Sequence, residues 1–263
     1  MLEKADLSKS LSKKDYKAQL SQLQQRLYDV QKTCWDAKIP TVILFEGWDA
    51  VGKGTCINLL TRRLDPRGFK VHPIRPARTY EKAHPWLWRF WLKLPNYGEI
   101  AIFDQSWYGR VLGERVEKLT PKKKWRRAYG DIVAFERQVA DDGHVIVKFW
   151  LHISKREQKR RFRKIEKDPL NWWRVTPEDW MRHKKHGRYL RAVENMLERT
   201  ETEHGPWTLV EATDRRWARI KIFKSIIHAM EEALNERGVE VMTDAAANPA
   251  DEQTGGQKHV GKD

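Results

Sequence analysis

The chain has 263 residues, of which 40% are hydrophobic and 33% charged, a composition typical of a folded protein and not of a disordered one. Its 51 Lys and Arg residues exceed its 36 Asp and Glu residues by 15, which indicates a polyanionic partner: nucleic acid, an anionic membrane or another phosphate polymer. Two cysteines exclude a disulfide framework, and the sequence contains neither an apolar leader nor a membrane span. We therefore expect a cytoplasmic protein that is not embedded in a membrane.

The first 38 residues predict an amphipathic helix. Apolar residues recur at alternating spacings of four and three from Tyr16 to Cys34, behind Ser12 and Asp15, which fit a helix cap. Because the repeat is short for a coiled coil, packing on its own domain is favoured over pairing with another chain. The second possibility keeps a homo-oligomer open.

A phosphate-binding loop is predicted after a β-branched run at residues 41–45. Gly47, Gly52 and Lys53 have the Walker A spacing, in which glycines turn successive N–H groups toward a phosphate. Lys53 adds a cation at the start of a helix, which itself favours anions. The strict motif has Ser or Thr directly after the lysine as a magnesium ligand, but here Gly54 follows and Thr55 comes one position late.

Two carboxylates are therefore the candidate magnesium ligands. Asp49 lies inside the loop, and Asp104 ends the apolar run 99–103 in the manner of a Walker B strand. Magnesium takes few protein oxygens and keeps water and phosphate ligands, which suits two carboxylates beside a phosphate loop. The alternative, a glycine-rich turn with a capping aspartate, is disfavoured because strand, loop, helix and second strand occur in order.

Alternating strand and helix signals predict an α/β fold, a doubly wound parallel sheet of the P-loop kinase type with helices on both faces. The expected strands are 41–45, 70–74, 99–103, 145–151 and 207–211. The P-loop domain is assigned to residues 39–243. Residues 244–263 are expected to be a disordered tail because they lack an apolar pattern.

Aromatic residues gather at 86–91 and invite a base-stacking interpretation. However, Leu87, Phe90, Trp91 and Leu94 have helical spacing after Pro85. The spacing favours packing in the core.

Residues 154–190 are expected to form a basic helical lid. Between 155 and 174 the sequence has nine cations and three acids, and Arg160, Arg163, Lys164 and Lys167 would share one helix face. A solvated charged face is the alternative, but such faces usually mix both signs. A polyanion track is therefore favoured.

These motifs together resemble the polyphosphate kinase 2 family, whose members transfer phosphoryl groups between inorganic polyphosphate and nucleotides. The resemblance covers roughly residues 20 to 235 and rests on segments 47–54, 83–91, 102–112 and 149–154. Further matching positions are Gln158, Arg161, Phe162, Ala192, Met196, Thr200, Thr202, Pro206 and Trp207.

The resemblance implies Mg2+ held by Asp49 and Asp104, and it accounts for Gly54 after the lysine. The implied catalytic residues are Asp49, Lys53, Asp104 and Arg161. Phosphate and nucleotide would contact Gly47, Gly52, Gly54, Thr55, Gln105 and Arg110. Polyphosphate would run toward Lys53 along Arg160, Arg163, Lys164, Lys167 and Arg174. The nucleotide would lie near Arg110 and the segment after the second strand.

The resemblance is strongest to the subgroup that phosphorylates AMP to ADP. An ADP or GDP kinase is one alternative, and a catalytically weakened binding homologue is another, because Gln105 stands where the family has arginine. His186 and Gly187 also depart from the family's usual tryptophan and acidic residue. A nucleic-acid-binding nucleoside triphosphatase is disfavoured because the sequence has no evident motor motif.

Overall fold

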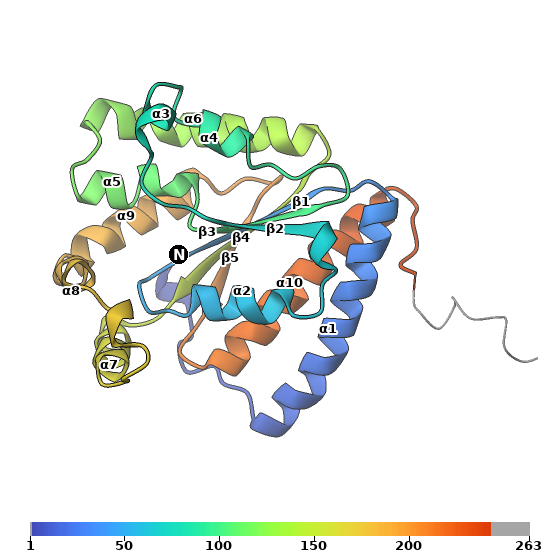
Figure 1. Ribbon diagram of the computed structural model, residues 1–263, viewed down its shortest axis with the longest axis horizontal. Helices are drawn as coiled ribbons and strands as arrows, with labels where there is room; N and C mark the ends of the chain where they lie inside the picture. Colours follow the sequence, from blue (N-terminus) through green and yellow to red (C-terminus); the bar gives the residue numbers. More distant parts are fainter. Residues whose placement is uncertain (1, 243–263) are drawn as a thin grey trace, which may run out of the picture.

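The computed structural model describes residues 2–242, which form a five-stranded parallel sheet with strand order β2-β3-β1-β4-β5 (Figure 1). The strands are β1 (Thr41–Gly47), β2 (Phe69–Pro73), β3 (Ile100–Asp104), β4 (Val145–His152) and β5 (Trp207–Glu211). The predicted α/β fold class is confirmed, and every strand lies within two residues of its predicted place. The expected tail at 244–263 lies outside the described residues.

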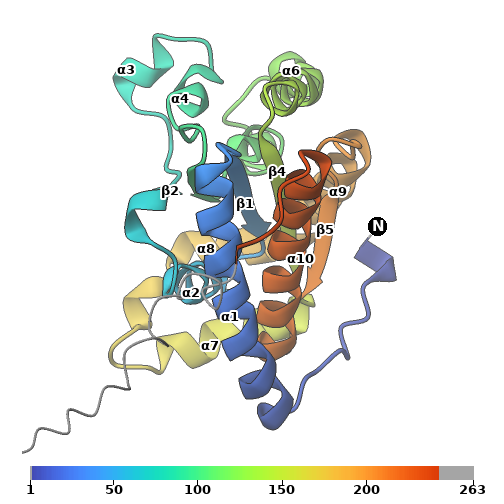
Figure 2. The same ribbon diagram turned by 90° about the vertical axis from the view of Figure 1, so that its right-hand side faces the viewer.

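Helices cover both faces of the sheet, with α1, α2 and α10 on one face and α6 on the other (Figures 1 and 2). The α-helices are α1 (Lys13–Asp36), α2 (Lys53–Thr61), α3 (Thr79–Lys82), α4 (Trp88–Trp91), α5 (Gly113–Val116), α6 (Lys122–Asp141), α7 (Lys155–Glu166), α8 (Pro177–Lys184), α9 (His186–Arg199) and α10 (Arg215–Glu236). Short 3-10 turns are η1 (Leu2–Lys4), η2 (Pro66–Gly68), η3 (Trp107–Arg110) and η4 (Trp172–Arg174). None of the helices from residue 2 to residue 242 is long and apolar enough to cross a bilayer.

The amino-terminal helix α1 packs on its own domain. Ser12 caps it by accepting a hydrogen bond from the Asp15 amide at 3.1 Å. Its apolar stripe enters the core through Leu27, Val30 and Cys34, each at most 1% exposed, and the helix runs beside α10 (Figure 2). This packing removes the helix as an argument for a homo-oligomer, which stays a prediction.

The aromatic segment forms a shorter helix than its spacing predicts. Helix α4 is a single turn that ends at Trp91 and passes into turns, and Pro95 disfavours helical backbone at Leu94, so the helix does not resume there. Phe90 is buried as expected, but Trp91 is 43% exposed and meets Phe135 in an edge-to-face contact, at a centroid distance of 4.8 Å. Core packing therefore holds for only part of the cluster.

The strand order places the phosphate loop at the reversal point of the sheet. Chain connections run to β2 and β3 on one side of β1 and to β4 and β5 on the other. Since every strand is parallel, the residues that follow them meet at one edge, where ligands bind in open α/β sheets. In the register, Phe45 of β1 lies opposite both Asp104 of β3 and Phe149 of β4. Asp104 thus flanks the loop.

We expect Leu27→Ala to lower the free energy of unfolding by about 2–5 kcal/mol, because a fully buried leucine leaves a cavity. Urea titrations at two protein concentrations measure this. The exposed Gln22→Ala, on the same helix, is the control and should change stability by less than about 0.5 kcal/mol. A loss that depends on protein concentration would mean that α1 pairs between chains.

Candidate active site

The phosphate loop leaves β1 at Gly47 and enters α2 at Lys53. Gly47 has a φ of +148°, and a Cβ there would lie 2.6 Å from the carbonyl oxygen of Leu151, so no larger residue fits. Gly52, the N-cap of α2, has a φ of +107°, which also favours glycine. A Cβ on Gly54 would meet nothing within 4 Å, so the surrounding protein leaves space above this residue.

The Lys53 ammonium lies over the loop. Its Nζ donates a hydrogen bond to the Gly47 carbonyl at 2.9 Å and lies 3.5 Å from the Trp48 carbonyl oxygen. In the described part of the chain no carboxylate oxygen lies within ion-pair distance of Lys53, although its charge acts on the Asp49 and Glu46 carboxyls, so the ammonium can meet an incoming phosphate. The Thr55 hydroxyl donates instead to the Gly52 carbonyl at 2.8 Å. The Thr55 hydroxyl proton is thus used within the loop, and the contact of Thr55 with phosphate stays a prediction.

The two candidate magnesium ligands belong to different elements: Asp49 lies inside the loop, and Asp104 lies on the strand beside it. Burial raises the pKa of the Asp49 carboxyl, while Lys53 and Arg182 lower it, the latter with its Nη1 3.9 Å from Asp49 Oδ2. Asp104 ends β3. Across residues 2–242, no hydrogen bond from a protein donor satisfies either carboxylate. Unsatisfied carboxylate oxygens beside a phosphate loop fit Mg2+, a hard cation with oxygen ligands.

Glu46 is a site residue that the sequence analysis missed. It is 4% exposed and accepts a hydrogen bond from the Ser106 hydroxyl at 2.7 Å. Burial raises the pKa of its carboxyl to about 7, against the opposing effect of Lys53 and with a smaller rise from the Asp104 charge. The available signal was an acid at the end of the apolar strand run 41–45.

The Arg161 side chain points its guanidinium at protein acceptors, whereas the resemblance implied a contact with polyphosphate. Its side chain is 5% exposed, and all five N–H groups are used. They donate to the carbonyl oxygens of Ala50, Val51, Ala212 and Thr213 and to the Glu157 carboxylate. With no donor left for a phosphate, Arg161 is a positioning residue that fixes the phosphate loop against the connection between β5 and α10.

The predicted basic stripe lies on α7, behind the cap formed by Ser154, as expected. Arg160 donates to Glu157 at 2.6 and 2.7 Å, which compensates its charge. The other predicted polyphosphate contacts are exposed: Arg163, Lys164, Lys167 and Arg174. None of these residues lines the cavity beside the phosphate loop. Their contact with polyphosphate stays a prediction that the cavity does not support.

A cavity of about 1250 Å3 opens beside the loop. It exceeds the roughly 300–1,000 Å3 of a typical small-ligand site, which leaves room for two substrates. Its walls come from the loop, residues 74–77 after β2, the α4 segment, η3, α6 and the start of α9. Of the predicted site residues, Gly47, Asp49, Gln105 and Arg110 line it directly.

Gln105 and Arg110 lie on the same cavity wall. Gln105 has a φ of +62°, an uncommon conformation for a residue with a side chain and one that clusters at functional sites. The Arg110 guanidinium lies 4.9 Å from the Trp86 ring centroid and 2.9 Å from Glu114. Arg110 is therefore held in place by stacking and an ion pair before any ligand binds.

The predicted lid segment contacts the phosphate loop. His186 at the start of α9 stacks on the Trp48 ring, with centroids 4.4 Å apart and planes 15° apart. Trp48 Nε1 donates to His152 Nδ1 at 2.9 Å. Gln158 Nε2 donates to the Asp49 carbonyl at 3.2 Å. Its side chain also lies 2.7 Å from His183 Nδ1. The motion of a lid stays a prediction.

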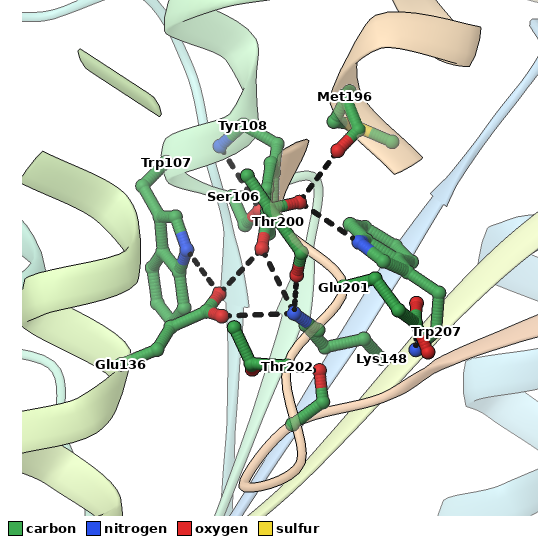
Figure 3. Close-up of polar contacts among 11 residues, drawn as sticks. Ser106, Trp107, Tyr108, Glu136, Lys148, Met196, Thr200, Glu201, Thr202 and Trp207 are labelled. Atoms are coloured by element: carbon green, nitrogen blue, oxygen red, sulfur yellow. Dashed lines mark hydrogen bonds and ion pairs between the residues drawn. The ribbon is translucent and has the colours of Figure 1, made fainter. Parts of the chain in front are cut away.

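A buried polar network anchors η3, the turn that carries Arg110 (Figure 3). Lys148 of β4 and Glu136 of α6 form an ion pair at 2.9 Å with both side chains 0% exposed. Glu136 accepts hydrogen bonds from Trp107 Nε1 at 2.9 Å and the Tyr108 hydroxyl at 2.7 Å. Lys148 also donates to the Thr200 carbonyl beyond α9. No motif in the sequence marks this network, although a lysine within the apolar run 145–151 is a signal of it.

Comparisons with known proteins agree with this geometry. The family model described as Polyphosphate kinase 2 matches residues 10–238. The Polyphosphate:AMP phosphotransferase of Pseudomonas syringae pv. tomato is 45% identical over 233 residues, which are 89% of this chain and 47% of that protein. The NDP-polyphosphate phosphotransferase 3 of Ruegeria pomeroyi is 31% identical over 236 residues, 90% of this chain and 78% of that protein.

Two solved structures are also similar. The crystal structure of a putative polyphosphate kinase 2 from Pseudomonas aeruginosa PA01 has a TM-score of 0.87 and 44% identity, and the match covers 89% of this chain and 50% of that one. The polyphosphate kinase 2 from Arthrobacter aurescens TC1 has a TM-score of 0.86 and 27% identity, with 97% and 89% covered. This chain spans about half the length of the first curated relatives it matches.

Lys148→Met should lower the free energy of unfolding by about 3–5 kcal/mol, because it leaves the Glu136 charge buried without its partner. Adding Glu136→Gln removes that charge and keeps an acceptor for Trp107 and Tyr108, so the double variant should be more stable than Lys148→Met alone. Urea unfolding of both single variants and the double variant measures this coupling. Additive losses would show that the pair does not act as a unit.

Glu46→Gln should flatten the pH dependence of stability between about pH 4.5 and 7. The folded state keeps the Glu46 proton up to a pKa of about 7, whereas the unfolded carboxyl has the ordinary value of 4.5. Between these values the folded state binds more protons, so stability falls as pH rises. Unfolding midpoints without added metal, compared with those of the unaltered protein, test this. Parallel curves for the two proteins would contradict it.

Proposed function

The chain belongs to the polyphosphate kinase 2 family, and from that premise we propose that it is a phosphotransferase that uses inorganic polyphosphate to convert AMP to ADP. The observation that carries this proposal is the Lys53 ammonium held above the phosphate loop by the Gly47 carbonyl, next to a cavity large enough for two substrates. AMP is preferred as acceptor because the curated relatives with 40 to 45% identity are named polyphosphate:AMP phosphotransferases.

The residues of the loop supply binding and charge neutralisation. Phosphoryl transfer needs in-line positioning and stabilisation of the charge on the transferring oxygens, with little covalent work from the protein. Backbone N–H groups of residues 47–54 cradle phosphate oxygens, and Lys53 adds a fixed cation. A phosphate oxygen of AMP is already an anionic nucleophile, so no strong general base is required.

Asp49 and Asp104 would hold Mg2+, which supplies charge neutralisation between donor and acceptor phosphates when bound. Arg161 keeps the loop in place through its bonds to the Ala50 and Val51 carbonyls. Cys34 and Cys56 are buried free thiols, which is compatible with the proposed cytoplasmic location.

A second candidate function is a weakened homologue that binds polyphosphate or nucleotide with little transfer. The position of Gln105 favours it, since this residue lines the cavity beside the loop with a neutral side chain where the family resemblance implies arginine. Glutamine keeps hydrogen bonds but lacks the fixed charge and the bidentate fork.

The test is formation of ADP or ATP from AMP and from ADP, with Mg2+ and long-chain polyphosphate. Lys53→Ala and Asp104→Asn should each lower kcat/KM on the order of 10²- to 10³-fold, because each removes charge stabilisation at the phosphate. Lys13→Ala, exposed on α1, is the control and should leave turnover unchanged. A preference for ADP over AMP would mean that ADP is the acceptor. Equal rates in the unaltered protein and all three variants would refute the proposed roles of Lys53 and Asp104.

Gln105→Arg separates the two candidates. A gain of tenfold or more in turnover supports a weakened enzyme, since arginine restores a cation at the phosphate. Absence of product before and after the substitution, with polyphosphate still bound, supports the binding protein.

A further inference from the structure

A second basic surface lies on the first turns of α6. It consists of Lys122, Lys123, Lys124, Arg126 and Arg127, all exposed, and we call it the α6 basic cluster. No acidic residue occurs in the sequence from 118 to 130. Arg126 also lies over the ring of Trp125, with 5.9 Å between the guanidinium carbon and the ring centroid. Five cations within six residues make this one of the most strongly charged exposed stretches of the chain.

Acids on the neighbouring elements compensate little of this charge. Glu114 pairs with Arg110 at 2.9 Å, and Glu117 pairs with Lys185 at 2.6 Å. Asp131 accepts from Trp86 Nε1 and from Arg127, the one member of the α6 basic cluster with an ion pair in the described part of the chain. That pair is solvent-exposed on the arginine side and so compensates little charge.

The placement of these cations is unfavourable unless an anion is present. The first turn of a helix carries a partial positive charge, and cations there are normally avoided. Pro121 precedes the helix and offers no side-chain cap, and Lys122 and Arg126 lie at the repulsive i,i+4 spacing. A bound polyanion would relieve this repulsion, so the arrangement favours a polyanionic ligand.

The α6 basic cluster is continuous with the cavity, whereas the α7 stripe is not. Lys124 and Arg127 line the cavity together with Gly47, Asp49 and Arg110. Helix α7 contributes only Gln158 to that lining and none of the stripe residues, and it lies on the opposite side of the molecule from α6 in Figure 1. An anionic chain that leaves the loop through the cavity therefore meets α6.

We propose that the α6 basic cluster is the docking surface for the part of a polyphosphate chain that extends out of the cavity, in place of the stripe on α7. This rests on the proposed function, which puts a polyphosphate end at the loop. A linear polymer of phosphates fits a row of exposed cations without base-reading groups, because the affinity comes from charge and counterion release.

The test compares three triple variants that each remove three exposed cations. They are Lys122→Ala/Lys123→Ala/Arg126→Ala on α6, Arg163→Ala/Lys164→Ala/Lys167→Ala on the stripe, and Lys13→Ala/Lys14→Ala/Lys17→Ala on α1 as the matched control. Lys124 and Arg127 stay intact because they line the cavity. Alanine keeps the helices.

The α6 variant should raise KM for long-chain polyphosphate on the order of tenfold, with kcat and KM for AMP unchanged. Tripolyphosphate, which ends within the cavity, should show no such change. The salt dependence of long-chain binding should weaken by about two in log–log slope, at about 0.7 for each lost contact. The α7 and α1 variants should match the unaltered protein in kcat, in KM for each substrate and in the salt dependence of binding.

A direct measurement of long-chain polyphosphate binding, without nucleotide, distinguishes a failure of the docking surface from a failure of the proposed phosphotransferase function. If the unaltered protein binds the polymer and makes no product, the proposed function fails, and reduced binding by the α6 variant alone still supports the docking surface. If the α7 variant loses affinity and the α6 variant does not, the docking surface is refuted. Equal losses in all three variants would also refute it, because net charge alone would explain them.

Discussion

The ion pair between Lys148 and Glu136 is the constraint on which the architecture of the site depends. Both side chains are fully buried, so each charge would be strongly destabilising without the other. The pair joins β4 to α6, and the hydrogen bonds that satisfy it come from Trp107, Tyr108 and the Thr200 carbonyl. Satisfying one buried charge pair therefore fixes η3, α6 and the end of α9 relative to the sheet, and η3 and α6 form one side of the cavity.

Arg161 performs the same task on the phosphate loop. Loop carbonyls are not satisfied within secondary structure, and a buried guanidinium with five donors satisfies several of them at once. The loop is thus pre-organised, with the Val51 N–H bonded to the Trp48 carbonyl within the turn and the Lys53 ammonium held at the Gly47 carbonyl, where it can meet a ligand. Pre-organised donors are effective because they do not have to reorient during the reaction.

The cations of this chain divide into three groups by environment. Lys148 and Arg161 are buried and structural, Lys53 and Arg110 are partly buried at the site, and the cations of α6 and α7 are exposed. The excess charge of the sequence measures only their sum. Burial and distance from the cavity decide which of them a phosphate polymer can reach, and this distinction separates the α6 basic cluster from the stripe on α7.

The sequence by itself determined the order of strands along the chain, the phosphate loop that contains Asp49, and the place of Asp104 at the end of the strand beside that loop. These features depend on local spacing and on the rule that parallel strands end together. That the two carboxylates together hold Mg2+ stays a prediction. Arg161 and Thr55 were predicted to meet phosphate because a sequence shows charge and donors but not where their hydrogen bonds go. Glu46, Glu136 and Lys148 acquired their roles only through burial. The tertiary structure alone decided that α6, some 70 residues beyond the phosphate loop in sequence, shares the cavity with it. The reason is that contacts between distant segments follow from packing, which no local pattern encodes.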